Sequence, residues 1–240
     1  YSRLTQRLIT AATAQTAEGV LYDVDMRLRP SGSKGPVATS LSSFKLYHRE
    51  SAWTWEKLAL TRARVICGDR SLHESLNVEI RSILAEPRDA RQTLADVLDM
   101  RKLMLREQGA TPLWDIKRVR GGLVELEFIA QALQLVHGPA NPALFDTNTI
   151  LALAKAQEVG ILSTGQGQTL YQAAGHYHRL TQVLRLCLTQ AYDPKTSPAG
   201  LNRIVASAAA CPDIATVEAL LADCQAAVAA AFDGLIGKPG

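Results

Sequence analysis

The sequence predicts a mainly α protein of the α+β class, in which the end of a small sheet is followed by an all-α helical bundle. Three observations predict this fold. Apolar residues recur at helical spacing almost without interruption from residue 70 onward. A single segment, residues 20–28, alternates with the period of a strand. Alanine and leucine are abundant while aromatic residues make up 5% of the chain, a composition that favours helices.

Residues 1–70 are expected to form the smaller, mixed part. Helical spacing over residues 2–17 predicts a first helix, which Gly19 ends. The segment VLYDVDMRL, residues 20–28, is the one convincing strand. The next segment, PSGSKGP, is a loop, because two prolines and two glycines sustain neither regular structure. Helical spacing then resumes, and it predicts two helices that break near Ser51.

Residues 71–240 are expected to form a helical bundle. The connections between its helices are short and rich in turn-forming residues, as in EPRD, HGPANP and DPKTSPAG, which is typical of bundles. The predicted helices span residues 71–86, 88–108, 121–137, 146–158, 163–190, 199–208 and 214–236.

The composition disfavours several classes of protein. A net charge of +3, without a basic stripe of interleaved aromatics, predicts no nucleic-acid partner. No run approaches about 18 consecutive apolar residues, so no membrane partner is predicted. The four cysteines are scattered without a CxxC pair, as in cytoplasmic proteins with reduced thiols. Because the chain starts in helical pattern without methionine, we expect a piece of a longer protein.

The segment LYDVDMRLRPSG, residues 21–32, carries the most chemistry. Side chains two apart on a strand share a face, so the acids Asp23 and Asp25 would share one with the arginines that follow. Carboxylates bind Mg²⁺ through hard oxygen atoms, and Arg27 and Arg29 could take phosphate oxygens. The alternative is that Asp25 and Arg27 pair with neighbours at a sheet edge, and spacing leaves both open. The opposite face, expected in a core, consists of Tyr22, Val24, Met26 and Leu28.

Three segments resemble motifs of the glutamine synthetase adenylyltransferases. LYDVDMRLRPSG resembles the third acidic motif of that family, and SAWTWEKLALTRARVICGD resembles the segment that follows it. DIKRVRGGLVELEFIAQ resembles a signature in which a Gly-Gly pair precedes an acidic helix. The three occur in the expected order across residues 21–131, which makes them specific together. The resemblance implies that residues 1–70 are the C-terminal part of a nucleotidyltransferase domain and that residues 71–240 are a helical bundle domain.

The resemblance also implies an activity. In this family one half of the protein attaches AMP from ATP to a tyrosine of glutamine synthetase, and the other half removes it by phosphorolysis. The segments AWTWE and RPSG are similar to the corresponding segments of the C-terminal, adenylylating half. The implied substrate is ATP, the implied cofactor is Mg²⁺, and the implied partners are glutamine synthetase and a PII-type signal protein.

Site residues follow from position in the motifs. The resemblance implies that Asp25 is the catalytic, metal-binding carboxylate and that Asp23 is not itself a ligand. For Arg27 and Arg29, predicted to contact the triphosphate, the alternative is a surface ion pair. Trp53 and Trp55 are expected to pack, with a place for one of them beside the nucleotide as the alternative. The residues predicted to bind ATP are Arg27, Arg29, Ser31, Gly32, Lys117, Gly121, Gly122 and Glu125.

The signature at residues 115–131 allows two interpretations. Gly121 and Gly122 precede a helix and would bring its N-terminus close to an anion, with Lys117 adding a positive charge. Glu125 keeps the acidity of the family position. A purely structural role at the domain junction is an equal alternative for this segment.

Two carboxylates of the family site are expected on an earlier Asp-x-Asp strand, which this sequence does not contain. We therefore expect the isolated chain to be inactive. A hypothesis of a different class is that residues 71–240 form a docking or regulatory module for glutamine synthetase or a PII-type protein. The deadenylylating half and the related PII uridylyltransferases are further alternatives, the latter disfavoured by RLRPSG and AWTWE.

Overall fold

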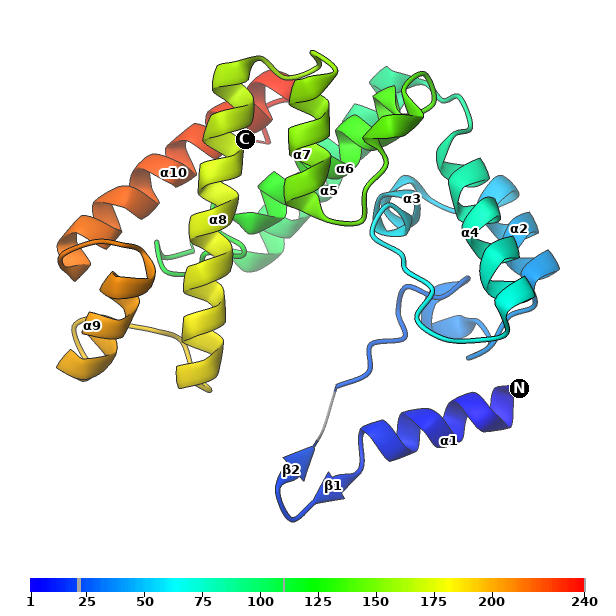
Figure 1. Ribbon diagram of the computed structural model, residues 1–240, viewed down its shortest axis with the longest axis horizontal. Coiled ribbons are helices and arrows are strands. Elements are labelled where there is room, and N and C mark those ends of the chain that lie inside the picture. The colour runs from blue at the N-terminus through cyan, green and yellow to red at the C-terminus, as the bar shows by residue number, and fades with distance from the viewer. Residues whose placement is uncertain (21–22, 110, 240) are drawn as a thin grey trace. The chain divides into compact units, whose positions relative to one another are not determined.

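The computed structural model describes residues 1–20, 23–109 and 111–239. Over these residues the chain forms ten α-helices and one two-stranded sheet, so the mainly α fold class is confirmed (Figure 1). The chain divides into two compact units, Tyr1–Glu86 and Pro87–Gly240.

The first unit has its core where α4 packs against α2 and α3. Leu58 of α3 and Ile83 of α4 are almost fully buried there. Helix α4 thus belongs to the first unit, whereas the sequence analysis assigned residues from 71 onward to the second. Helix α1 contributes no buried residue. The elements are α1 (Ser2–Ala12), β1 (Gln15–Thr16), β2 (Gly19–Val20), η1 (Gly32–Lys34), α2 (Leu41–Glu50), α3 (Thr54–Leu60) and α4 (Arg70–Leu84).

The strand predicted over residues 20–28 is found only at Val20 and is wrong for the other described residues of that segment, 23–28. Strand β2 ends at Val20, the predicted core residue Tyr22 lies outside the described residues, and residues 23–26 form no regular structure. Two other side chains expected in a core are exposed, Val24 by 37% and Leu28 by 60%. A strand requires hydrogen bonds to a neighbouring strand. The only sheet in the described part of the chain pairs β1 with β2, so this segment has no such neighbour there.

The predicted helices of the first unit are present in the structure. The break near Ser51 is confirmed, because α2 ends at Glu50 and α3 begins at Thr54. The first helix is shorter than predicted and ends at Ala12. The residues after it turn back as a hairpin, in which Gly19 adopts a φ of +101° that favours glycine.

The second unit is the predicted helical bundle. Each of its helices begins and ends within three residues of the predicted limits. Side chains of Asp89, Asn148, Ser163 and Asp213 accept hydrogen bonds from the first turns of four helices, which explains where those helices begin. The elements are α5 (Ala90–Gln108), α6 (Leu123–His137), η2 (Pro142–Leu144), α7 (Thr149–Glu158), α8 (Thr164–Cys187), α9 (Ala199–Ala208) and α10 (Ile214–Leu235).

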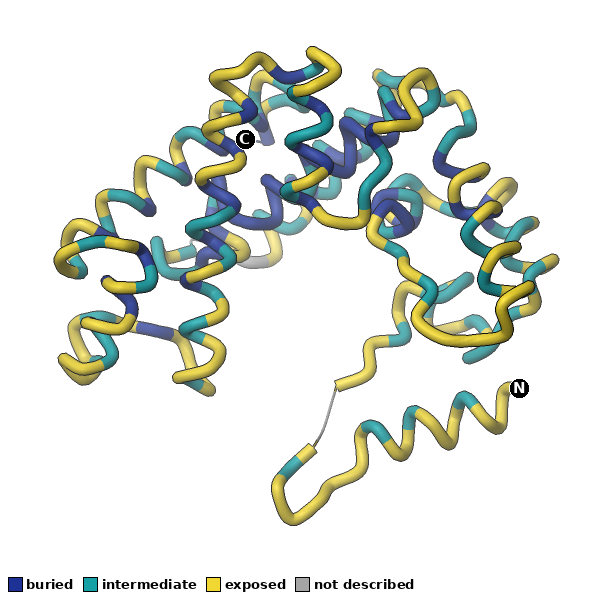
Figure 2. The backbone as a smooth tube through the Cα atoms, viewed as in Figure 1, coloured by how far each residue is buried: buried dark blue, intermediate teal, exposed yellow. Residues whose placement is uncertain are grey.

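Helix α6 is the centre of this bundle. It packs against α5, α7, α8 and α10, and most of its residues are buried (Figure 2). Helix α10 is the one described helix that is long and apolar enough to cross a membrane. Its residues Val217, Leu221 and Phe232 are nevertheless fully buried, on a helix that packs against α6, α8 and α9. The apolar face of α10 is therefore part of the core of the bundle.

Glycine at position 121 allows the loop before α6 to touch α10. Gly121 has a φ of +74°, and a Cβ added there would lie 1.8 Å from the carbonyl oxygen of Gln225 in α10. Its own carbonyl oxygen accepts a hydrogen bond of 2.8 Å from the hydroxyl of Tyr177 in α8. Gly122 is restricted by space alone, since its Cβ would lie 2.5 Å from the oxygen of Ile116.

Replacing Gly121 with alanine should therefore destabilise the second unit by about 2 to 5 kcal/mol, from steric overlap and an unfavourable backbone conformation. Gly234→Ala is the matched control, because a Cβ on that residue of α10 meets nothing within 4 Å. The control should leave stability unchanged or raise it by about 1 kcal/mol. Urea unfolding followed by circular dichroism measures both. Equal stability of the two variants would contradict the predicted close approach.

Candidate functional site

The predicted phosphate segment folds as a compact loop around one guanidinium group. We call residues 26–35 the arginine loop. Arg29 donates hydrogen bonds from Nη1 to the oxygen of Met26 (2.6 Å), from Nε to that of Gly35 (3.1 Å) and from Nη2 to that of Ser33 (3.1 Å). Three carbonyl groups therefore already occupy the side chain that was predicted to contact a triphosphate. The structure gives Arg29 a role in holding the loop, and phosphate contact stays a prediction.

The tip of the arginine loop has a left-handed backbone. Ser31 has a φ of 64° and Gly32 a φ of 54°. The amide of Gly32 donates to the oxygen of Arg29 at 2.8 Å and closes the turn. A Cβ on Gly35 would lie 2.0 Å from the oxygen of Pro30, so glycine is required there. Ser31 is the unusual member, because side chains other than glycine rarely adopt this conformation.

Asp25 and Arg27 form an ion pair next to the loop. Arg27 donates from Nη2 to Oδ2 (2.6 Å) and from Nε to Oδ1 (3.0 Å) of Asp25, and its backbone amide donates to Oδ1 (2.9 Å). These contacts from Arg27 lower the pKa of Asp25 to about 2. The side chains are 52% and 84% exposed, so solvent weakens their attraction. The arrangement matches the ion-pair alternative, and it leaves an ionised carboxylate open to another cation.

A buried acid of the second motif joins α3 to α2. Glu56 is 4% exposed, and its Oε1 accepts the hydroxyl of Tyr47 at 2.7 Å. Its Oε2 accepts the amide of Trp53 at 2.9 Å, which caps α3. Burial, and next the hydrogen bond to Glu56, raise the pKa of Tyr47. Tyr47 thus joins the second motif to α2.

Trp53 was expected to pack, and that expectation is wrong. The residue is 71% exposed, and Trp55 is 37% exposed. The alternative, a place beside the nucleotide, stays open for Trp53.

The third motif surrounds a second buried acid in the other unit. Glu125 is fully buried, and its Oε1 accepts Arg101 Nε at 2.7 Å. Its Oε2 accepts the amide of Gly121 at 2.9 Å and pairs with Arg120, which also pairs with Asp233 of α10. Arg101 is itself fully buried. Both oxygens of Glu125 therefore bind groups of the protein, which favours the structural alternative over contact with ATP.

The backbone amides at the start of α6 also donate to groups of the protein itself. The amides of Leu123 and Val124 donate to the oxygens of Ile116 (2.8 Å) and Lys117 (3.0 Å). These amides were expected to lie near an anion. Carbonyl oxygens of the preceding loop accept their hydrogen bonds instead. The side chain of Lys117 is exposed and makes no hydrogen bond or ion pair with the described residues. Of this motif, it is the group that stays available to a ligand.

Several residues of these clusters were missed by the sequence reasoning. Arg101 follows Val97 and Thr93 at intervals of four, so helical spacing alone places it on the buried face of α5. Glu56 lies three residues after Trp53, the spacing of a helix capping box. Tyr47 carried no such signal.

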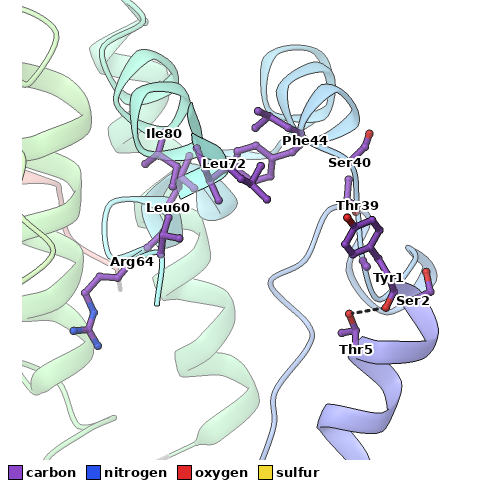
Figure 3. Close-up of a pocket in the computed structure, with 15 residues that line it drawn as sticks. Tyr1, Ser2, Thr5, Thr39, Ser40, Phe44, Leu60, Arg64, Leu72 and Ile80 are labelled. Atoms are coloured by element: carbon purple, nitrogen blue, oxygen red, sulfur yellow. Dashed lines mark hydrogen bonds between the residues drawn. The ribbon is translucent and has the colours of Figure 1, made fainter. Parts of the chain in front are cut away.

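The first unit also contains an apolar cavity of about 800 Å³ (Figure 3). Its lining includes Phe44, Leu60, Leu72 and Ile80, and Arg64 is the only charged side chain among the lining residues. In Figure 3 Arg64 extends away from these apolar side chains. No residue of the arginine loop lines the cavity, so it is separate from the predicted chemistry.

The metal prediction rests on Asp25 alone within this chain. No group of three or more His, Cys, Asp or Glu side chains in the described ranges could hold a metal ion. One carboxylate does not complete a Mg²⁺ site, because this ion requires octahedral oxygen coordination.

Comparison with known families separates the two units. Residues 1–78 match the family described as glutamate-ammonia ligase adenylyltransferase. Residues 90–232, more than half of the chain, match the family described as GlnD PII-uridylyltransferase.

Curated relatives match along the whole chain. It is 46% identical over 237 residues to a bifunctional glutamine synthetase adenylyltransferase/adenylyl-removing enzyme of Rhodopseudomonas palustris (strain BisB5). Proteins of the same description from Agrobacterium fabrum (strain C58) and Bradyrhizobium diazoefficiens are 46% and 44% identical over 245 and 236 residues. These matches cover 98% to 100% of this chain and 24% of each relative. The chain therefore spans about a quarter of the length of these relatives.

The buried cluster predicts unequal effects of removing its two charges. Glu125→Leu leaves the fully buried Arg101 without a carboxylate and should cost about 3 to 5 kcal/mol of unfolding free energy. Arg101→Met should cost less, because Glu125 keeps Arg120 and the amide of Gly121. The double variant should be more stable than the sum of the two losses predicts, by at least about 1 kcal/mol. Urea unfolding of all four proteins measures this coupling, and strictly additive losses would contradict it.

Replacing Arg29 and replacing Arg27 should affect the arginine loop differently, although the two residues lie only two apart. Arg29→Met removes three hydrogen bonds to carbonyl groups and should open the loop. Arg27→Met, the matched control, removes only contacts with Asp25 and should leave it closed. Limited proteolysis within residues 26–35 should be faster in the first variant by about tenfold or more. Equal cleavage rates in both variants would contradict the role of Arg29.

Proposed function

Because the chain belongs to the glutamine synthetase adenylyltransferase family, with a helical unit of the family described as GlnD PII-uridylyltransferase, we propose that it is part of the adenylylating half of a bifunctional enzyme. This half transfers AMP from ATP to a tyrosine of glutamine synthetase. The observation that carries the proposal is the exposed carboxylate of Asp25. Its pKa is about 2, and it lies next to the arginine loop.

The groups around Asp25 suit a polyphosphate. An ionised, exposed carboxylate binds a hard cation such as Mg²⁺, which when bound would neutralise charge on the triphosphate. Arg27 is held only by an exposed pair, so its guanidinium can exchange Asp25 for phosphate oxygens. Lys34 is exposed on the same loop and makes no side-chain hydrogen bond or ion pair with the described residues. Three charged groups, Asp25, Arg27 and Lys34, thus lie close in sequence to the left-handed turn at Ser31.

Asp25 requires further carboxylates, and we propose that other parts of a longer protein supply them. Two findings support this view. The described residues hold no complete metal-ligand group, and the chain spans 24% of its relatives. The chain alone is therefore expected to be inactive.

A second function, docking or regulation, concerns the helical unit. Its match to the family described as GlnD PII-uridylyltransferase and the structural use of Glu125 favour it. We propose that residues 87–240 hold the catalytic half in register with glutamine synthetase or a PII-type signal protein, and do no chemistry themselves.

Asp25→Asn in the full-length protein tests the proposal. The variant should lose AMP transfer from α-labelled ATP to glutamine synthetase, with Mg²⁺ present, by about 100-fold or more. Asp23→Asn is the matched control, an exposed neighbour that is not a proposed ligand, and it should stay within about threefold of the unmodified protein. If Asp25→Asn instead abolished phosphorolysis of adenylylated glutamine synthetase and spared transfer, the chain would belong to the deadenylylating half. Full activity of both kinds in this variant would overturn the role of Asp25.

A further inference from the structure

We propose that the groove between helices α8 and α9 docks an acidic segment of glutamine synthetase that also carries apolar side chains. The inference rests on the docking function proposed for residues 87–240, and it assigns a surface to that function. The two helices pack against each other, and an open groove of about 620 Å³ lies between them. Its lining residues are Val183, Gly200, Arg203, Ile204, Ser207 and Ala208.

The groove presents aliphatic side chains to solvent. Ile204 of α9 is 52% exposed, and Leu186 of α8 is 87% exposed. Leu186 follows the lining residue Val183 by three positions, so both lie on the same face of α8. Two neighbouring helices therefore expose apolar groups at one place. Exposed apolar side chains with polar residues around them are typical of sites where another protein binds.

The charge around the groove is positive. Residues 164–208, from the start of α8 to the end of α9, contain four Lys or Arg side chains and a single acid, Asp193. The carboxylate of Asp193 already accepts the amide of Lys195 at 3.0 Å and the hydroxyl of Thr196 at 3.2 Å. Arg203, in contrast, is exposed and makes no hydrogen bond or ion pair with the described residues. Its guanidinium is therefore available to a carboxylate of another protein.

Hydrogen bonds hold the groove in shape before any partner binds. Arg179 of α8 donates from Nε to the carbonyl oxygen of Ala208, the last residue of α9, at 3.2 Å. Near the start of α9, Asn202 accepts the hydroxyl of Tyr192 at 2.6 Å and donates to the oxygen of Pro194 at 2.9 Å. These contacts tie both ends of α9 to α8 and to the connection between the helices. A groove that is already formed loses little conformational entropy when a partner enters it.

These features select the kind of occupant. Apolar side chains of a partner helix or loop would fill the groove, and carboxylates beside them would pair with Arg203. A symmetric dimer through this face is disfavoured, because it would bring two basic surfaces together. Of the two partners proposed for residues 87–240, glutamine synthetase is the one that the description of the relatives names, so we assign the groove to it.

Arg203→Glu in the full-length protein tests the charged part of the groove. Its Kd for glutamine synthetase, measured by surface plasmon resonance without ATP, should rise by about tenfold or more, because an attraction becomes a repulsion. Arg91→Glu is the matched control, since it changes the net charge equally at an exposed residue of α5 outside the groove. The control should change Kd by less than about threefold.

Ile204→Ser tests the apolar part of the groove. Because the side chain is half exposed, the variant should still fold, which circular dichroism checks. Its Kd for glutamine synthetase should rise by about fivefold or more. Added salt should weaken binding of this variant as steeply as binding of the unmodified protein, and binding of Arg203→Glu less steeply. An unchanged Kd in either Arg203→Glu or Ile204→Ser would overturn the inference.

Binding measured without ATP separates this inference from the proposed functions. If AMP transfer were intact and both variants bound glutamine synthetase normally, the inference would fall and the proposed enzymatic function would stand. If the full-length protein transferred no AMP but bound glutamine synthetase through Arg203 and Ile204, the enzymatic function would fall and the docking surface would stand. If the unmodified protein did not bind glutamine synthetase, the docking function would fall and this inference with it. Loss of binding to a PII-type protein alone would overturn the assigned occupant.

Discussion

The buried carboxylate of Glu125 is the constraint on which the helical unit depends. An ion removed from water must be compensated fully, and here Arg101, Arg120 and the amide of Gly121 do so. These partners come from α5 and from the loop before α6, and Arg120 extends the cluster to Asp233 of α10. One charge therefore fixes four segments at once. Gly121 follows from the same requirement, because only a residue without a Cβ lets the loop come this close to α10, whereas a Cβ on Gly122 would overlap with Ile116 and Val119 of the loop itself.

The first unit also contains a buried acid that joins segments, but it joins fewer of them than Glu125 does. Glu56 joins the N-terminus of α3 to Tyr47 of α2. Asp25, in contrast, is exposed and has one partner side chain, Arg27, among the described residues. The acids that hold the structure are thus buried and saturated, while the acid assigned to chemistry is accessible. Burial and the number of donors distinguish these roles, which sequence position alone does not.

The sequence predicted the helices well because apolar spacing and capping residues are local signals, as the agreement of α5 to α10 shows. It failed for residues 20–28, where alternation indicated a strand but a sheet partner is a non-local requirement. It could not decide whether Glu125 contacts a ligand or has a structural role, because the decisive partner, Arg101, lies 24 residues earlier in the chain. Tyr47 could not be found at all, because its hydrogen bond with Glu56 depends on how α2 and α3 meet.

The arginine loop has a consequence for the order of events in binding. The contacts of Arg29 span only three to six residues of sequence. Contacts this short form with little loss of loop-closure entropy, so the loop can fold early and independently of distant segments. Its conformational entropy is then lost during folding and not during ligand binding. A ligand that uses this loop meets a rigid template with a guanidinium at its centre.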